Sequence, residues 1–169
     1  MKKIVLAFIG LFLYSAVIGQ TLDEKYGKDV KTIEAIIDAY YEVISGSSED
    51  SWQFERDKFL HSANAVIIRL DDRGNAKYHS LEEDYIPILL NQRKDMYEIE
   101  LKREVRHFGN IAQVWSAFEI RTDRKKPSNI RGLNSIQLHF ENDRWFIDSW
   151  TMQMESADNQ LVQEFLNDK

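Results

Sequence analysis

Apolar residues recur at helical spacing in the first half of the chain and alternate with polar residues in the second half. In residues 29–45 the apolar positions return every three or four places, which predicts an amphipathic helix that its first residue caps and Gly46 ends. A second, shorter helix is predicted over residues 50–60, where Asp50 and Gln53 form a capping box. Two helices therefore precede the first strand.

The segment before the long strands combines a hairpin with a third helix. Residues 65–79 contain a β-rich apolar run, the turn signal DDRGN and a short return strand, which together predict a small hairpin. Ser80 and Glu83 form the S-x-x-E capping box of a helix predicted over residues 81–90. Because proline removes a backbone donor and clashes with the preceding turn, Pro87 predicts a kink in this helix.

The stretch from Tyr97 to Met152 reads as three or four long antiparallel strands. In its first strand, strict alternation places Glu98 and Glu100 on a wet face and Arg103 on the otherwise apolar face. The stretch is therefore expected to form a sheet with one buried face.

The order of elements predicts an α+β fold. Three helices interrupted by a small hairpin are followed by a long meander, whose last turn is placed at Asn142 and Asp143. Such a layout folds as a curved antiparallel sheet with helices packed on its concave face, a roll in shape. No internal repeat or low-complexity stretch marks a boundary, so residues 21–169 are predicted to form a single domain.

The first twenty residues are predicted to be a secretory signal peptide. Lys2 and Lys3 form a positive start, residues 4–13 form an apolar stretch, and small residues precede a cleavage site near Gly19 or Gln20. Because the apolar run is short for a membrane span, an N-terminal anchor helix is the less favoured alternative. The sequence predicts export to the periplasm or the extracellular space, without membrane attachment after cleavage.

Charge and cysteine content narrow the class of protein. The formal net charge is −6, and removing the two lysines of the signal segment takes it to about −8, which argues against nucleic acid as a partner. No cysteine is present, so disulfides, cysteine nucleophiles and thiolate metal sites are excluded. The sequence contains no metal-ligand spacing, phosphate loop or serine-hydrolase elbow, and neither a metal nor a cofactor is predicted.

Several segments resemble the nuclear transport factor 2-like superfamily, in the branch of SnoaL-like and ketosteroid isomerase-like folds. They are the first helix running into ISG, the phrase KFLHSANAVI, the helix start SLEEDYI and the final strand RWFIDSW, and FGNIAQVWSAFEIR and RGLNSIQL look like an uncharacterised bacterial branch. The resemblance covers roughly residues 31–154 and implies a cone-shaped roll. That scaffold hosts isomerases, dehydratases, cyclases, binding proteins and association modules, so the resemblance leaves the function open.

The residues that the resemblance assigns to ketosteroid isomerisation are matched only in part. An oxyanion-hole tyrosine corresponds to Tyr40 or Tyr41. Where that family keeps a carboxylate base, at the end of the first strand, this chain has Arg69, which cannot accept a proton. The second acid falls in a segment where this chain has Asn134 and Gln137. The constellation for steroid isomerisation is therefore incomplete, and the histidine pair of scytalone dehydratases is also poorly matched.

His61, Tyr40 and Glu119 are the candidate catalytic residues. An imidazole where the second helix meets the first strand borders the cavity in this fold, and it can act as an acid or base near neutral pH. Glu119 is a usable base if it faces another carboxylate inside the cavity, because burial and like charge raise a carboxyl pKa. The plainer interpretations are a histidine that caps the helix or is satisfied in the core, and a glutamate on a solvated sheet face.

The candidate ligand-binding residues combine aromatic rings with isolated polar groups. Arg103 stands on an apolar face and needs a carboxylate partner or an anionic ligand. Asn134 shares its face with apolar neighbours, so it either points into the cavity or is satisfied by nearby backbone. Trp115 lies on a mixed face that suits a homodimer interface. The full set of ligand-binding candidates is Tyr40, Trp52, His61, Tyr85, Arg103 and Asn134.

Two classes of function remain, and a third alternative accompanies them. The first is an exported binding or accessory protein that holds a small, largely apolar molecule between sheet and helices. The second is a cofactor-independent isomerase, dehydratase or cyclase that uses acid–base residues of that cavity. The third is a protein-interaction module whose cavity is filled by its own side chains. The missing acid and base favour the first.

Overall fold

The computed structural model describes residues 22–87, 94–161 and 163–166. This part of the chain contains a six-stranded sheet, two helices that pack on it, and short helical segments. In chain order the elements are η1 (Gly27–Val30), α2 (Ile33–Val43), α3 (Phe54–Leu60), β1 (His61–Leu70), β2 (Ala76–Ser80), η2 (Leu81–Tyr85), β3 (Tyr97–Phe108), β4 (Ile111–Arg121), β5 (Arg131–Glu141), β6 (Arg144–Met154) and α5 (Gln163–Leu166).

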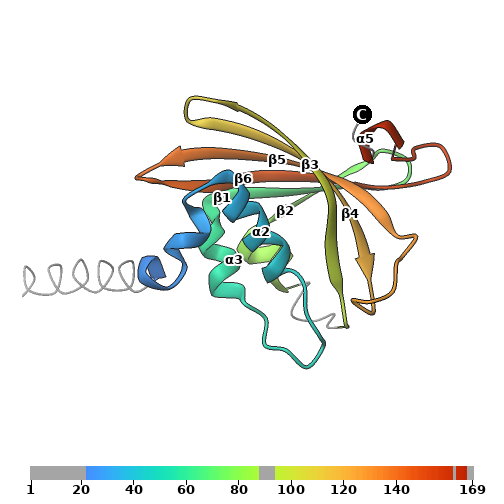
Figure 1. The fold of residues 1–169 in the computed structure, drawn as a ribbon, viewed down its shortest axis with the longest axis horizontal. Helices are drawn as coiled ribbons and strands as arrows, with labels where there is room; N and C mark the ends of the chain where they lie inside the picture. Colours follow the sequence, from blue (N-terminus) through green and yellow to red (C-terminus); the bar gives the residue numbers. More distant parts are fainter. Residues whose placement is uncertain (1–21, 88–93, 162, 167–169) are drawn as a thin grey trace, which may run out of the picture.

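The strands form one curved, open sheet in the order β2-β1-β6-β5-β4-β3 (Figure 1). Neighbouring strands are antiparallel except β1 and β6, which run parallel. Helices α2 and α3 cover one face, called the inner face here, while α5 lies on the opposite, outer face (Figure 1). The predicted α+β roll is confirmed, and the long meander is strands β3 to β6.

The core lies between α2 and the inner face of the sheet. Tyr40 and Tyr85 pack edge-on against Trp150 of β6, with ring centroids 5.9 and 5.1 Å apart. Trp145 and Ile147 point inward from the same strand, as alternation predicts. Aromatic packing of this kind adds to the hydrophobic contribution of each ring, so these residues hold the helix layer on the sheet.

Helix α2 starts later than the sequence pattern predicts. Thr32 is its N-cap, and the Thr32 hydroxyl accepts a hydrogen bond from the amide of Ala35 at 3.0 Å. Asp29, the predicted cap, lies in η1 and accepts a hydrogen bond from Nε of Arg56 at 2.8 Å. The Asp29 carboxylate therefore forms a buried ion pair with Arg56 of α3 instead of capping α2.

The capping box predicted at Asp50 does not form. Helix α3 begins at Phe54, and its N-cap residue, Gln53, makes no capping hydrogen bond with its side chain. The Asp50 carboxylate instead accepts a hydrogen bond from the amide of Ser47 at 2.8 Å. Asp50 thus closes the loop after α2 rather than opening α3.

The Ser80 cap of the third helical segment is confirmed, but Asp84 rather than the predicted Glu83 supplies the reciprocal acceptor. The Ser80 hydroxyl accepts a hydrogen bond from the amide of Glu83 at 3.2 Å, while the amide of Ser80 donates to the carboxylate of Asp84. The segment Leu81–Tyr85 is a single π-helical turn. The predicted continuation of this helix beyond Pro87 lies outside the described residues.

The last hairpin turn follows the sequence prediction. Asn142 and Asp143 both have positive φ angles, 51° and 62°. Two consecutive left-handed residues make the type I′ turn that matches the twist of two-residue hairpins, and asparagine and aspartate tolerate that conformation best after glycine. The turn therefore fixes the register of β5 against β6.

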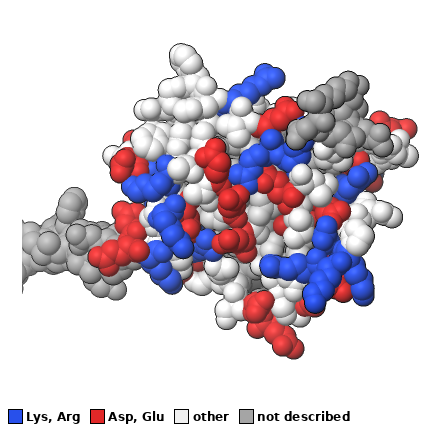
Figure 2. Space-filling view, viewed as in Figure 1, with Lys and Arg blue, Asp and Glu red and all other residues white. Residues whose placement is uncertain are grey.

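Charged side chains of both signs are interspersed over the face shown in Figure 2. Exposed ion pairs such as Lys31–Asp143, at 2.8 Å, and Lys58–Glu82, at 2.9 Å, link different elements at the surface. Solvent-exposed pairs contribute at most about 1 kcal/mol each. Stability therefore depends mainly on the core.

Gly132 lies where two other groups come close to its Cα atom, so a larger residue does not fit. A Cβ atom there would lie 2.7 Å from the backbone oxygen of Gln153 and 2.7 Å from the ring of Phe118. We expect Gly132→Ala to lower the free energy of unfolding by about 1–3 kcal/mol in chemical denaturation. Gly27→Ala, which meets no atom within 4 Å, is the control and is expected to change it by less than about 0.5 kcal/mol. Equal effects would contradict the packing account.

Candidate functional site

A β-bulge in β3 decides which of its charged residues face the helices. Glu100 pairs with Phe118 of β4 but Lys102 pairs with Ala117, so Leu101 is an extra residue that reverses the alternation. As a result Glu100 and Arg103 point to the same inner face, although they are three residues apart.

The wet-face prediction for Glu98 and Glu100 is therefore wrong. Glu98 precedes the bulge, pairs with Ile120 of β4 and is only 8% exposed, and Glu100 is half-buried. The prediction that Arg103 lies on the inner face is confirmed. The bulge lies between Glu100 and Arg103, so both residues face inward although they are an odd number of positions apart.

Five residues on the inner side form what we call the inner polar cluster: Tyr41, Glu98, Glu100, Ser116 and Asn134. Asn134 is fully buried and its side-chain nitrogen donates to Glu98 Oε1 at 3.1 Å and to the hydroxyl of Tyr41 at 3.4 Å. Both amide hydrogens are thus used, while Oδ1 of Asn134 is buried without a hydrogen-bond partner in the described structure. The inward orientation predicted for Asn134 is confirmed.

The hydrogen bonds of the cluster have a defined direction. The Ser116 hydroxyl donates to Oε1 of Glu100, because a carboxylate can only accept. Ser116 must then accept from the hydroxyl of Tyr41, 2.5 Å away. Burial raises the pKa of the Tyr41 hydroxyl well above its ordinary value, so it stays a donor. The chain of bonds therefore runs from Asn134 to Glu100.

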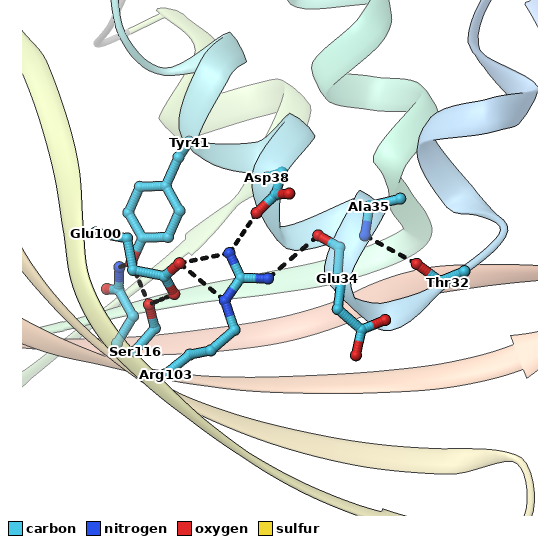
Figure 3. Close-up of polar contacts among 9 residues, drawn as sticks. Thr32, Glu34, Ala35, Asp38, Tyr41, Glu100, Arg103 and Ser116 are labelled. Atoms are coloured by element: carbon cyan, nitrogen blue, oxygen red, sulfur yellow. Dashed lines mark hydrogen bonds and ion pairs between the residues drawn. The ribbon is translucent and has the colours of Figure 1, made fainter. Parts of the chain in front are cut away.

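Arg103 anchors this chain to helix α2 (Figure 3). Its Nε donates to Glu100 at 2.8 Å, and its terminal nitrogens bind Asp38, Glu100 again and the backbone oxygen of Glu34. The carboxylate partner that the sequence required for Arg103 is therefore present. Because its donors are engaged in this network, Arg103 positions Glu100 and α2 and is not free to hold an anionic ligand in this structure.

Glu98 is the most perturbed acid of the cluster. Burial raises the pKa of its carboxyl to about 7, against the opposing effects of the hydrogen bond from Asn134 and the positive charge of Arg69. Tyr40 and Tyr85 lie within electrostatic reach of the same carboxyl, and burial raises the pKa of both phenols. Near neutral pH, Glu98 can therefore take up or release a proton beside neutral phenol donors.

A pocket of about 650 Å³ opens next to Glu98, between the end of α2, the loop after it and the ends of β1 and β4. We call it the mouth pocket. Two of its lining residues are neighbours of Glu98. Ile120 pairs with Glu98 across the strands, and the Ser45 hydroxyl accepts a hydrogen bond from the Glu98 backbone amide at 2.9 Å. The pocket lining includes Val43, Ile44, Ser45, Asp50, Trp52, Arg69, Lys94, Asp95, Met96 and Ile120.

His61 lies at the end of α3, where it is the C-cap residue. Its Nδ1 is 2.8 Å from the backbone oxygen of Asp57 and 3.3 Å from the Asp57 carboxylate, so Nδ1 faces two acceptors and carries a proton. Its Nε2 is buried without a hydrogen-bond partner among the described residues. The ring lies 6.4 Å from that of Tyr40, and His61 also lines a second pocket of about 960 Å³ beside η2.

Glu119 is not brought together with the other catalytic candidates. It pairs with Ile99 rather than with Glu98, which places it on the outer face of β4, where it forms an ion pair with Arg121. Tyr40 and His61 lie on the inner side. The inner acid is therefore Glu98, which sequence reasoning missed because no glycine or other residue typical of a bulge marks Leu101.

The remaining ligand-binding candidates divide between core and pocket. Tyr85 is buried against Trp150, whereas Trp52 is partly buried in the lining of the mouth pocket. Within residues 22–87, 94–161 and 163–166 no group of three or more His, Asp or Glu side chains is placed to hold a metal ion. No helix in those ranges is long and apolar enough to cross a membrane.

Comparison with known proteins shows the fold. No protein-family profile and no curated protein matches the chain. An NTF2-like protein from Cytophaga hutchinsonii is 11% identical with a TM-score of 0.56, over 72% of this chain and 97% of that chain. A candidate ketosteroid isomerase from Shewanella frigidimarina is 15% identical with a TM-score of 0.52, over 70% of this chain and 91% of that chain. A candidate calcium/calmodulin-dependent kinase II association domain from Exiguobacterium sibiricum is 14% identical with a TM-score of 0.52, over 74% of this chain and 92% of that chain. The predicted nuclear transport factor 2-like fold is confirmed, and the different names select no single function.

The raised pKa of Glu98 makes a prediction about stability. Because the folded-state pKa, about 7, lies above the ordinary value of 4.5, Glu98 destabilises the fold as pH rises from about 4.5 through 7. In chemical denaturation, Glu98→Gln should remove this loss, so that the variant gains on the order of 3 kcal/mol over the wild type across that range. Glu104→Gln, an exposed position on the same strand, is the control and should track the wild type. A Glu98→Gln curve parallel to the wild-type curve would contradict a buried acid.

Proposed function

We propose that this chain, which has the nuclear transport factor 2-like fold, is a binding or accessory protein that holds a small, largely apolar molecule in the mouth pocket. The observation that carries the proposal is a pocket of about 650 Å³ that is lined by apolar side chains together with polar ones, and whose lining residues Ile120 and Ser45 neighbour the buried acid Glu98. Concave sites with apolar walls and a few placed polar groups are typical of small-molecule binding.

The walls of the mouth pocket supply the apolar contact. Val43 and Ile44 belong to the core side of α2, and Ile120 and Met96 close the pocket from β4 and the segment before β3. Burying apolar ligand surface against them contributes about 25 cal/mol per Å² before the costs of association. The pocket can therefore give useful affinity to a ligand with few polar groups.

An acid–base enzyme is the second candidate, and Glu98 is the observation that favours it. A carboxyl with a pKa of about 7 beside the phenols of Tyr40 and Tyr85 has the proton-transfer capacity that isomerases, dehydratases and cyclases need. In this alternative Glu98 takes the role that the sequence assigned to Glu119. His61 would accept a proton through Nε2, since its Nδ1 faces the backbone oxygen and the carboxylate of Asp57.

The proposal includes export and self-association. Residues 1–20 would direct the chain through a secretory pathway, which places the ligand in the periplasm or outside the cell. A homodimer would form through the outer face, where Trp115 is 45% exposed and offers an apolar contact.

Filling the mouth pocket should abolish binding. We expect Ile120→Trp to weaken the binding of the neutral apolar dye Nile red by at least about tenfold in a fluorescence titration, because the indole occupies the ligand's volume. Ile130→Trp adds the same side chain at a position that is 54% exposed and outside the pocket lining, and it should bind like the wild type. No dye binding to the wild type, or equal binding to both variants, would contradict the proposal.

Export makes a separate prediction about the mature N-terminus. Protein isolated from the periplasm or medium of cells that express the full chain should begin near Gly19 or Gln20, as N-terminal sequencing would show. A lysine substituted for Leu11, within the apolar stretch, should keep the chain inside with its leader uncleaved. Recovery of full-length wild-type protein from the cytosol alone would overturn this part of the proposal.

A further inference from the structure

We infer that the molecule held in the mouth pocket is an organic anion, and that its carboxylate binds the guanidinium of Arg69 and the indole N–H of Trp52. This inference rests on the proposed function, since it assigns a charge and an orientation to the ligand of the same pocket. Its apolar body would lie against Val43, Ile44 and Ile120.

Arg69 is a cation without a partner at the edge of the pocket. In the described structure it makes no ion pair or hydrogen bond through its side chain, and its sheet neighbours, Lys77 and Met152, offer no negative charge. Arg69 is exposed, and it alternates with the fully buried Ile67 along β1, which places its side chain on the inner side of the sheet. From there its positive charge acts on both Glu98 and Tyr85. By contrast, ion-pair partners are present in the described ranges for Arg56, Arg103, Arg121 and Arg131.

Trp52 adds an unused donor to the same lining. Its indole nitrogen is buried and has no hydrogen-bond partner in the described structure. A buried donor without an acceptor is unfavourable, and a ligand oxygen at that point would satisfy it. Because indole N–H can donate but cannot accept, the complementary ligand atom is an acceptor.

The acidic groups of the lining are already engaged by their own loop. Asp50 accepts a hydrogen bond from the amide of Ser47 at 2.8 Å. Asp95 accepts from the amide and the hydroxyl of Ser48 at 2.7 and 2.8 Å, and these bonds hold the pKa of the Asp95 carboxyl below its usual value. The donors of Arg69 and Trp52 have no such partners in the described structure. The pocket can therefore bind a ligand group that accepts hydrogen bonds and carries negative charge.

Glu98 tolerates an anion nearby because it can become neutral. It lies beside Ile120 on the neighbouring strand and accepts a hydrogen bond from Asn134. The phenols of Tyr40, Tyr41 and Tyr85 are within electrostatic reach, and Arg69 is the cation that lowers its carboxyl pKa. A carboxylate bound to Arg69 offsets that cation, so Glu98 takes up a proton when the ligand binds. Glu98 then adds no further negative charge beside the bound carboxylate.

A pair of ligands that differ only in charge tests the inference. Octanoate and 1-octanol share the same apolar chain, and isothermal titration calorimetry would measure the affinity of each for the full-length protein. We expect the wild type to bind octanoate more tightly than 1-octanol, and Arg69→Gln to weaken octanoate roughly fivefold while leaving 1-octanol unchanged. Arg73→Gln removes an exposed arginine from the nearby β1–β2 turn and should change neither affinity.

The outcomes separate this inference from the proposed function. Equal binding of the two ligands, or a preference for 1-octanol, with no effect of Arg69→Gln, would overturn the anion assignment and leave an apolar binding pocket. Loss of both ligands in Arg73→Gln as well as in Arg69→Gln would also overturn it, since charge at position 69 would not be the cause. Failure of the wild type to bind either ligand would contradict the proposed function itself.

Discussion

The extra residue at Leu101 in β3 gives the inner face of the sheet its acidic groups. Without the bulge, the strand would alternate strictly, and Glu100 and Arg103 could not share a face. With it, Arg103 joins Glu100 to Asp38 of α2 (Figure 3). Glu100 also completes the hydrogen bonds that begin at Asn134 and pass through Tyr41 and Ser116. A polar network of this kind must be nearly complete, because each buried group left unpaired costs free energy.

The incomplete groups mark where the structure is open to a ligand. In the described ranges the buried polar atoms without hydrogen-bond partners are Asn134 Oδ1, His61 Nε2, both carboxylate oxygens of Asp57, Nε of Arg144 and the indole nitrogens of Trp52 and Trp150. Only Trp52 among these residues lines the mouth pocket, and burial raises the pKa of the neighbouring acid, Glu98, to about 7. The same arrangement supports binding and acid–base chemistry, and the two differ in whether a ligand atom comes within reach of the Glu98 proton.

The fold could be predicted from the sequence because its signals are local and regular. The alternation in β5 and β6 placed Asn134, Trp145 and Ile147 inside, and the Asn142–Asp143 turn fixed the last hairpin. The helix caps were less predictable. Asp29 accepts a hydrogen bond from Arg56 and Asp50 accepts one from the amide of Ser47, so neither carboxylate caps the helix predicted to begin there.

The site could be predicted only in part, because one inserted residue reverses the face of every residue after it. Arg103 was expected inside, yet Glu98 was expected in water, and no composition signal at Leu101 reveals the change. The sequence makes Glu119 a candidate inner acid only if it faces another carboxylate across the strands. Its register with Ile99 puts it on the other face.

Direct titration of the Glu98 carboxyl tests the account at its centre. The side-chain carboxyl carbon of Glu98 can be followed by carbon-13 NMR as a function of pH, with its resonance assigned from the Glu98→Gln variant. We expect a midpoint at about pH 7, because burial disfavours the charged carboxylate. A midpoint near the ordinary value of 4.5 would show that Glu98 is solvated and would contradict the buried acid.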